Sequence, residues 1–81
     1  MYKRMKNYKG KSTKKRFELL TPNENRVMVL TGRGYLTKQI AEIMDIAKST
    51  VDSYRLRTIK KLSITRDTYR RWAYKLATGR I

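Results

Sequence analysis

Residues 37–62 read TKQIAEIMDIAKSTVDSYRLRTIKKL, and the pattern of this stretch decides the fold. Apolar residues recur at helical spacing in its first part, which predicts a helix of about two turns over 38–44 with the Thr37 hydroxyl as its cap. After a break, Ser49 is followed three positions later by Asp52, a pattern that predicts a longer helix capped by Ser49 and reaching about residue 62. A short helix, a tight turn and a long helix form the order that a helix-turn-helix requires.

Two further helices are predicted on either side of this pair. On the N-terminal side, Thr21-Pro22-Asn23-Glu24 offers a capping hydroxyl, a proline suited to the first helical position and a glutamate that completes a capping box. The helix that follows is expected to end at Gly32-Arg33-Gly34. On the C-terminal side, a helix capped by Thr65 or Asp67 is expected to run to Gly79. No segment alternates apolar and polar residues as a strand does, so the sequence predicts an all-α domain of four helices.

The apolar residues of these helices are expected to form a small core, because a domain of this length buries only about 60% of the surface that its unfolded chain exposes. Seven residues have the spacing of core positions: Val27, Met28, Ile40, Ile43, Ile46, Val51 and Leu62. The small side chain of Ala41 should let the two central helices approach closely, with Ile46 filling the gap between them.

The composition excludes most enzyme chemistry and favours a polyanionic partner. The chain has 81 residues with 21 Lys and Arg against 6 Asp and Glu, a net charge of +15, and it contains neither Cys nor His. Disulfides, thiolate nucleophiles, imidazole bases and the commonest zinc sites are therefore excluded, and no cofactor or metal is expected. No apolar run approaches the roughly 20 residues that span a membrane. Nucleic acid, an anionic membrane surface and the ribosome are the partners that such a charge attracts.

Residues 1–18 are expected to form a basic N-terminal arm, flexible in the absence of a partner, before a domain over 19–81. This arm has no sustained apolar period and cannot bury enough surface to offset the entropy of ordering. It carries eight cations against one acid: Lys3, Arg4, Lys6, Lys9, Lys11, Lys14, Lys15 and Arg16. Because the other cations lie in the body of the chain, loss of the arm should weaken its attraction to phosphates without abolishing it.

A series of short motifs runs without a gap from residue 20 to about residue 76. They are Leu20-Thr21-Pro22-Asn23-Glu24, Gly34, Thr37-Lys38-Gln39-Ile40-Ala41-Glu42, Ile46-Ala47-Lys48-Ser49-Thr50-Val51 and Lys61-Leu62. In this order they resemble the DNA-binding domain of bacterial regulators of the LuxR, FixJ and GerE type. Ala47 stands where that family usually has a serine cap, and Asp52 where many members have a basic residue. Residues 39–62 also match the pattern of sigma-factor region 4, a near relative.

The resemblance implies a LuxR/GerE-type helix-turn-helix domain and a sequence-specific transcriptional regulator, of bacterial or phage origin, that binds double-stranded DNA. The short helix would brace on the phosphate backbone, and the long one, the recognition helix, would enter the major groove. The residues expected to contact DNA are Thr37 and Lys38, at the start of the short helix, and Lys48, Ser49, Thr50, Asp52, Ser53, Arg55, Arg57 and Lys60 on the recognition helix. The arm would add contacts to the backbone or the minor groove. Such a protein would be cytoplasmic and associated with the nucleoid, and would not be an enzyme.

The last predicted helix carries more large apolar residues than a small core needs, namely Tyr69, Trp72, Ala73 and Leu76. In the family that the chain resembles, this helix forms the dimer interface, so a homodimer on DNA is expected. Only the arm precedes Leu20, so regulation is expected through abundance, dimerisation or a partner protein. Two alternatives stay open: a module like sigma-factor region 4 whose main partner is RNA polymerase, and a protein that binds structured RNA without sequence preference.

Overall fold

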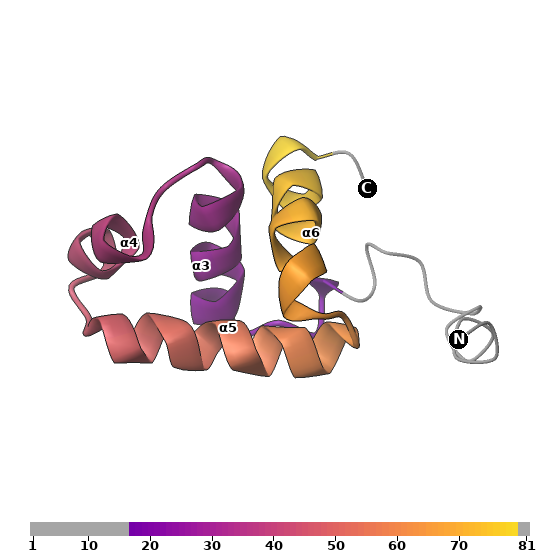
Figure 1. Ribbon diagram of the computed structural model, residues 1–81, viewed down its shortest axis with the longest axis horizontal. Helices are drawn as coiled ribbons and strands as arrows, with labels where there is room; N and C mark the ends of the chain where they lie inside the picture. Colours follow the sequence, from indigo (N-terminus) through magenta and orange to yellow (C-terminus); the bar gives the residue numbers. More distant parts are fainter. Residues whose placement is uncertain (1–16, 80–81) are drawn as a thin grey trace, which may run out of the picture.

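The structure is a computed structural model, and it describes residues 17–79 of the chain. Within these residues the chain forms four α-helices: α3 (Pro22–Gly32), α4 (Thr37–Met44), α5 (Lys48–Leu62) and α6 (Arg66–Thr78). Helix α5 lies along one side of the molecule, with α3 and α6 side by side across it and α4 at the end where α5 begins (Figure 1). This arrangement confirms the predicted all-α fold, with α4 and α5 as its helix-turn-helix. The cations of the predicted arm, up to residue 16, lie outside the described residues.

The outer helices begin where the sequence predicts. At the start of α3, the Thr21 hydroxyl accepts a hydrogen bond from the backbone N–H of Glu24 at 3.2 Å, and the Glu24 carboxylate accepts one from the backbone N–H of Thr21 at 3.0 Å. Helix α6 is capped by Thr65, whose hydroxyl accepts from the N–H of Thr68 at 3.3 Å. It ends at Gly79, which has the left-handed backbone (φ 72°) that glycine adopts without strain.

The predicted cap of α4 is wrong by one residue. Thr37 is the first residue of the helix, and Leu36 occupies the cap position. The Leu36 backbone N–H donates to Oε1 of Gln39 at 2.8 Å, which satisfies the donor just ahead of the helix. The Thr37 hydroxyl is instead engaged by the Arg55 guanidinium at 2.7 Å. A contact between residues this far apart in the chain leaves no local signature.

The predicted cap of α5 at Ser49 is also wrong, because Ala47 holds the cap position and makes no side-chain hydrogen bond. The turn between α4 and α5 explains the shift. Asp45 has a left-handed backbone (φ 57°), and the N–H of Ile46 closes the turn on the carbonyl of Ala41 at 3.0 Å. This closure places Ala47 in extended conformation directly ahead of the helix, so Ser49 already lies in its first turn.

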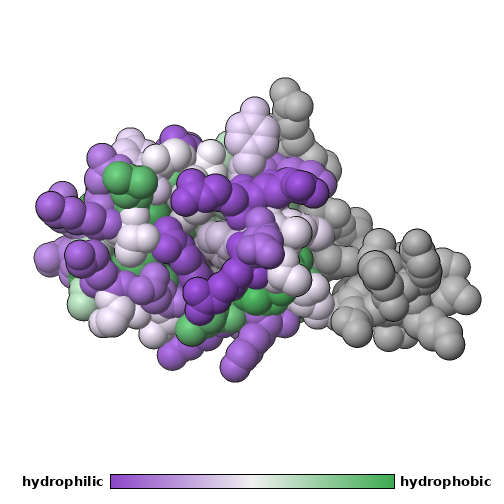
Figure 2. All heavy atoms as spheres, viewed as in Figure 1, coloured by the Kyte–Doolittle hydropathy of each residue, from purple (hydrophilic) through white to green (hydrophobic). Residues whose placement is uncertain are grey.

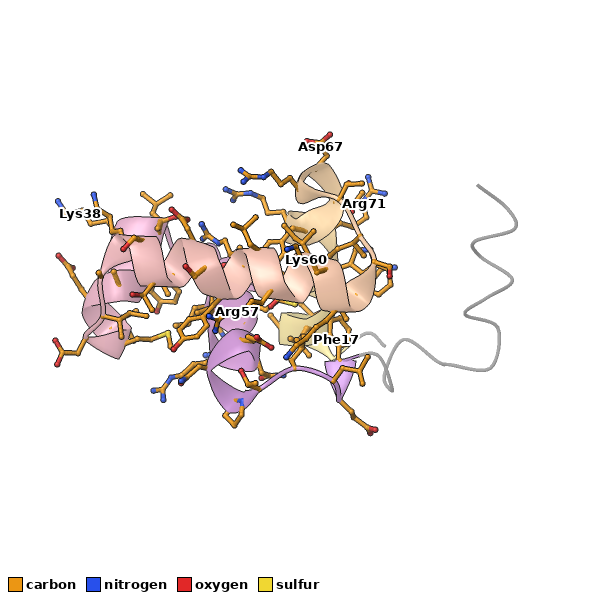
Figure 3. The ribbon with its side chains drawn as sticks, turned by 90° about the horizontal axis from the view of Figure 1, so that it is seen from below. Phe17, Lys38, Arg57, Lys60, Asp67 and Arg71 are labelled. Carbon is orange, nitrogen blue, oxygen red and sulfur yellow. The ribbon has the colours of Figure 1, made fainter. Side chains whose placement is uncertain are left out.

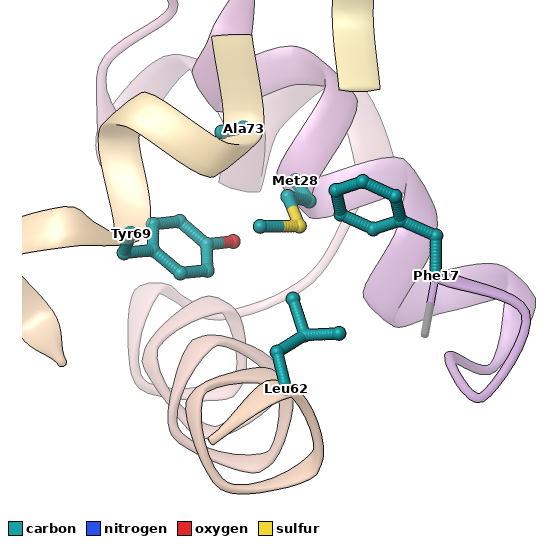
Figure 4. Packing of buried hydrophobic residues seen from close by; sticks show 5 residues of the cluster. All are labelled: Phe17, Met28, Leu62, Tyr69 and Ala73. Carbon is teal, nitrogen blue, oxygen red and sulfur yellow. The ribbon is translucent and has the colours of Figure 1, made fainter. Parts of the chain in front are cut away.

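The core consists of two adjoining clusters that share helix α3. The cluster between α3, α6 and the end of α5 contains Phe17, Met28, Leu62, Tyr69 and Ala73 (Figure 4). The cluster between α3, α4 and the start of α5 contains Val27, Leu30, Ile40, Ala41 and Val51. Helix α3 therefore joins the helix-turn-helix to α6 and determines how α5 is held.

Four residues test the packing predictions. Ala41 is buried between the helices and Ile46 packs against the same cluster, as predicted. Ile43 is 46% exposed, so its assignment to the core is wrong: α4 is short and buries only one side, and Ile43 lies beyond the edge of that side. Phe17, just before the segment predicted to fold, is buried in the first cluster. No helix among residues 17–79 is long and apolar enough to span a membrane.

Candidate nucleic-acid interface

One side of helix α5 faces outward, and no other helix of the described segment covers it. Its inner side is anchored by Val51, Thr58 and Leu62, which are fully buried. Seen from below, α5 lies in front of the other helices along its length (Figure 3). A bare helix of this kind fits the major groove of DNA, which is about 12 Å wide.

Most of the predicted DNA-contacting residues lie on exposed surface of α4 and α5. Seven of the ten are exposed: Lys38, Lys48, Ser49, Asp52, Ser53, Arg57 and Lys60. Ser49, Ser53 and Lys60 are spaced by four and seven residues and form a line along the outward side of α5. Lys38 lies at the end of the molecule where α5 begins, whereas Arg57 and Lys60 lie further along it (Figure 3). Thr37 and Thr50 are half-buried.

Arg55 differs from the other predicted contacts because its guanidinium is held inside the protein. Nη1 donates to the Thr37 hydroxyl at 2.7 Å and lies 3.5 Å from the Asp52 carboxylate, while Nη2 donates to the Thr31 hydroxyl at 3.4 Å. The guanidinium also lies 6.0 Å from the centre of the Tyr69 ring, and the side chain is only 21% exposed. Arg55 thus joins α5 to α3, α4 and α6. Since the Thr37 oxygen accepts this bond, its own proton is available for a second partner such as a phosphate.

The neighbouring carboxylate of Asp52 remains open to a ligand. Its side chain is 64% exposed although it pairs with Arg55. The Arg55 cation, 3.5 Å away, balances this negative charge. A carboxylate held in this way can accept a hydrogen bond from the exocyclic amine of a cytosine. Phosphate groups offer the carboxylate no such donor.

An ion pair with a buried carboxylate engages one cation of α5, Lys61. Glu24 is 2% exposed, and its carboxylate accepts a hydrogen bond from Nζ of Lys61 at 2.7 Å as well as from the Thr21 N–H. Burial by itself would raise the pKa of the Glu24 carboxyl, but the hydrogen bonds from Lys61 and Thr21 and the Lys61 charge outweigh it, so the pKa lies below its ordinary value. The pair ties the start of α3 to the last turn of α5 and helps fix the angle at which α5 is presented.

The residues predicted for dimerisation divide between core and surface. Tyr69 and Ala73 are 5% and 0% exposed, so they belong to the core of the chain and present no surface to a second copy. Trp72 and Leu76 are half-buried against the same cluster. The Trp72 ring packs edge-on against Phe17 with 5.9 Å between ring centres, and the Lys75 ammonium lies 5.6 Å from its centre.

Beside the outward side of α5, a cavity of about 310 Å³ lies between α5 and α6. Two residues of α6 that the sequence reasoning missed line it, Arg66 and Arg70, together with Leu56 of α5. Hydrophilic side chains prevail on the face seen in Figure 2, with smaller apolar patches between them. The exposure of Leu56 follows from its place on the helix, three residues after Ser53, and this periodicity could have identified it. No cluster of potential metal ligands occurs within 17–79.

Comparison with known proteins agrees with this geometry. The family described as bacterial regulatory proteins, luxR family, matches residues 18–69. The tetrathionate response regulatory protein TtrR of Salmonella typhimurium is 37% identical over 46 residues, which are 57% of this chain and 22% of that protein. The chain therefore corresponds to less than a quarter of the length of this relative. No solved structure gives a match.

The family match covers α3, α4 and α5 in full and reaches Tyr69 in α6, so it includes the helix-turn-helix and the outward side of α5. It confirms the predicted resemblance and, with it, the assignment of a LuxR-type helix-turn-helix of the DNA-binding, transcription-regulating kind. The matched residues make up more than half of the chain, and the chain belongs to the luxR family of bacterial regulatory proteins.

Proposed function

We propose that the protein is a transcriptional regulator that binds double-stranded DNA at specific sequences, with α5 in the major groove. The observation that carries this proposal is the uncovered side of α5, where hydroxyl, carboxylate and ammonium groups are exposed together. These are groups that form hydrogen bonds with base edges. A carboxylate repels phosphates, so the exposed Asp52 on this side of α5 favours the reading of bases.

Contacts to phosphates would position α5 without contributing sequence information. On the described surface, Lys38 and the Thr37 hydroxyl at the start of α4 are suited to one strand of the backbone. The cations of residues 1–16 would add further contacts that depend on salt. A protein that neutralises about six phosphates loses on the order of a thousandfold in affinity between 50 and 200 mM salt.

Two copies would bind together on DNA in this proposal, each with its α5 in one half-site. With Tyr69 and Ala73 in the core, the contact between copies would involve the exposed parts of Trp72 and Leu76. Arg70, Arg71 and Lys75 are also exposed on α6 and would repel one another across such a contact unless they lay at its rim, so we propose a weak dimer that DNA stabilises. The protein would act in the cytoplasm, on the nucleoid.

The test is selection from a library of randomised duplex DNA by the full chain at about 150 mM salt, followed by sequencing. We expect an enriched motif made of two inverted half-sites, and we expect Ser53→Ala to change the motif without changing the salt dependence of binding. Tight binding with no enriched motif would refute sequence-specific recognition. Equal affinity for duplex RNA would favour binding of structured RNA, and capture of RNA polymerase in the absence of DNA would favour a module like sigma-factor region 4.

A further inference from the structure

Leu56 is a large apolar residue on the outward side of α5. It is 43% exposed, and it lies on the line formed by Ser49, Ser53 and Lys60, three residues after the second and four before the third. The other large apolar residues exposed within 17–79 lie outside α5: Leu19, Tyr35, Leu36, Ile43 and Tyr74. The polar line on α5 is therefore interrupted by one aliphatic side chain.

The fold does not require an aliphatic residue at this position. Helix α5 is held by Val51, Thr58 and Leu62, and Leu56 is in neither core cluster. It borders the cavity between α5 and α6, yet much of its surface remains open. Single exposed leucines are ordinary on protein surfaces. The location of this one carries the argument, because it projects from the side of α5 that the proposed function places against the bases.

We propose that Leu56 determines specificity for the DNA sequence by contacting the C5-methyl group of a thymine, an inference that rests on the proposed function. From Ser49 to Leu56 the helix rises about 10 Å, which corresponds to about three base pairs. On either side of Leu56 along the helix, the hydroxyl of Ser53 and the ammonium of Lys60 can pair with polar atoms of base edges. The thymine methyl is the apolar group that the major groove offers, and it is the one that matches Leu56.

The same contact would exclude other bases at that position. The leucine side chain offers no hydrogen bond, so a guanine or cytosine edge packed against it would lose water without gaining a partner. The preference for thymine thus comes from attraction to its methyl group and from the cost of burying polar edges of competitors.

The experiment removes the methyl group from the DNA and the leucine from the protein, separately and together. The full chain binds its selected motif and a series of duplexes in which each thymine in turn is replaced by deoxyuridine, which lacks only the methyl group. The protein is compared with Leu56→Ala, with Leu56→Gln as a second variant, and with Leu19→Ala, which removes a leucine of similar exposure (50%) outside α5. Circular dichroism checks that each variant is folded.

We expect one deoxyuridine position in each half-site to weaken binding by the wild type about fourfold, the effect of removing one buried methyl group. Leu56→Ala and Leu56→Gln should bind the two duplexes equally, and should lose the preference for thymine at that position when the selection is repeated. Leu19→Ala should retain the wild-type response. The inference is overturned, while the proposed function stands, if a specific motif is found but deoxyuridine weakens binding at none of its thymine positions. The same holds if deoxyuridine still weakens binding by Leu56→Ala. If no motif is enriched, the proposed function fails and the inference falls with it.

Discussion

Replacing Gly32 by alanine sets helix propensity against tertiary packing. Gly32 is the last residue of α3, where this helix packs directly on α6. A Cβ atom at this position would lie 2.2 Å from the carbonyl oxygen of Ala73 and 2.6 Å from its carbonyl carbon. Both are backbone atoms that cannot rotate away, so α6 must retreat by about 1 Å or more to reach ordinary contact distance.

The two effects have opposite signs and known sizes. Propensity alone favours alanine by about 1 kcal/mol, because glycine costs that much in a helix. The retreat of α6 would draw Tyr69 and Ala73 away from Met28 and Leu62, and overpacking of this kind costs about 1–3 kcal/mol. With backbone on the α6 side of the clash we expect the upper end, and hence a net loss of about 2 kcal/mol in the free energy of unfolding. In a domain of this size that loss lowers the Tm by about 8–16 °C.

Urea unfolding measures this change through the fluorescence of Trp72, the single tryptophan of the chain. The matched control is Gly34→Ala: no atom lies within 4 Å of a Cβ there, so the variant has only the strain of a left-handed backbone (φ 96°), about 1 kcal/mol. The reasoning is refuted if Gly32→Ala is as stable as the wild type or more stable, since propensity would then outweigh the contact with α6.

Three further substitutions test the groups around α5. Arg55→Ala should lower the free energy of unfolding by about 2 kcal/mol, because the charged hydrogen bond to Thr37 is lost. The salt dependence of DNA binding should stay nearly unchanged in this variant. A much weaker salt dependence would mean that the guanidinium contacts a phosphate. Burial raises the pKa of Tyr69 from 10.0 to about 12, so the wild type should lose about 1.4 kcal/mol of stability per pH unit as pH rises from 10 to 12. Tyr69→Phe should lack this loss, and equal pH dependence of urea unfolding in both proteins would contradict the assignment. The lowered pKa of Glu24 stabilises the fold above about pH 4.5, and that stability is lost as pH falls through the lower pKa of the folded state. Glu24→Gln, which gives up the ion pair with Lys61, should be about 1 kcal/mol less stable at pH 7 and lose less on acidification, a difference that acid titration by circular dichroism would reveal.

The features that the sequence predicted correctly depend on residues close together in the chain. The capping box at Thr21 and the cap of α6 at Thr65, one of the two residues predicted for it, are closed within three residues, and the glycine that ends α6 needs only its own backbone freedom. The exposed line of Ser49, Ser53 and Lys60 follows from helical periodicity once α5 is assigned. These are local properties, and the structure confirms the helices and the exposure they imply.

The predictions that failed involve contacts between distant segments. The Thr37 hydroxyl is engaged by Arg55 from α5, and Ala47 becomes the cap of α5 because of how the preceding turn closes. Ile43 has the spacing of a core residue, yet the other residues of the described segment leave 46% of it exposed. Whether an amphipathic position is covered depends on which elements pack there, and spacing alone does not tell this.

Sequence by itself determined that residues 17–79 form four helices, that the middle two are a helix-turn-helix, and that the chain is strongly cationic. Periodicity, capping and charge depend on the identity of each residue and of its near neighbours in the chain. Only the tertiary structure decided which polar groups on α5 are available to DNA. It turned the Arg55 guanidinium inward to Thr37 and Thr31, engaged Lys61 with Glu24, and left Leu56 in the open. The physical reason is that a side chain's partners depend on the packing of helices distant in the chain, which the spacing of residues along one helix does not determine.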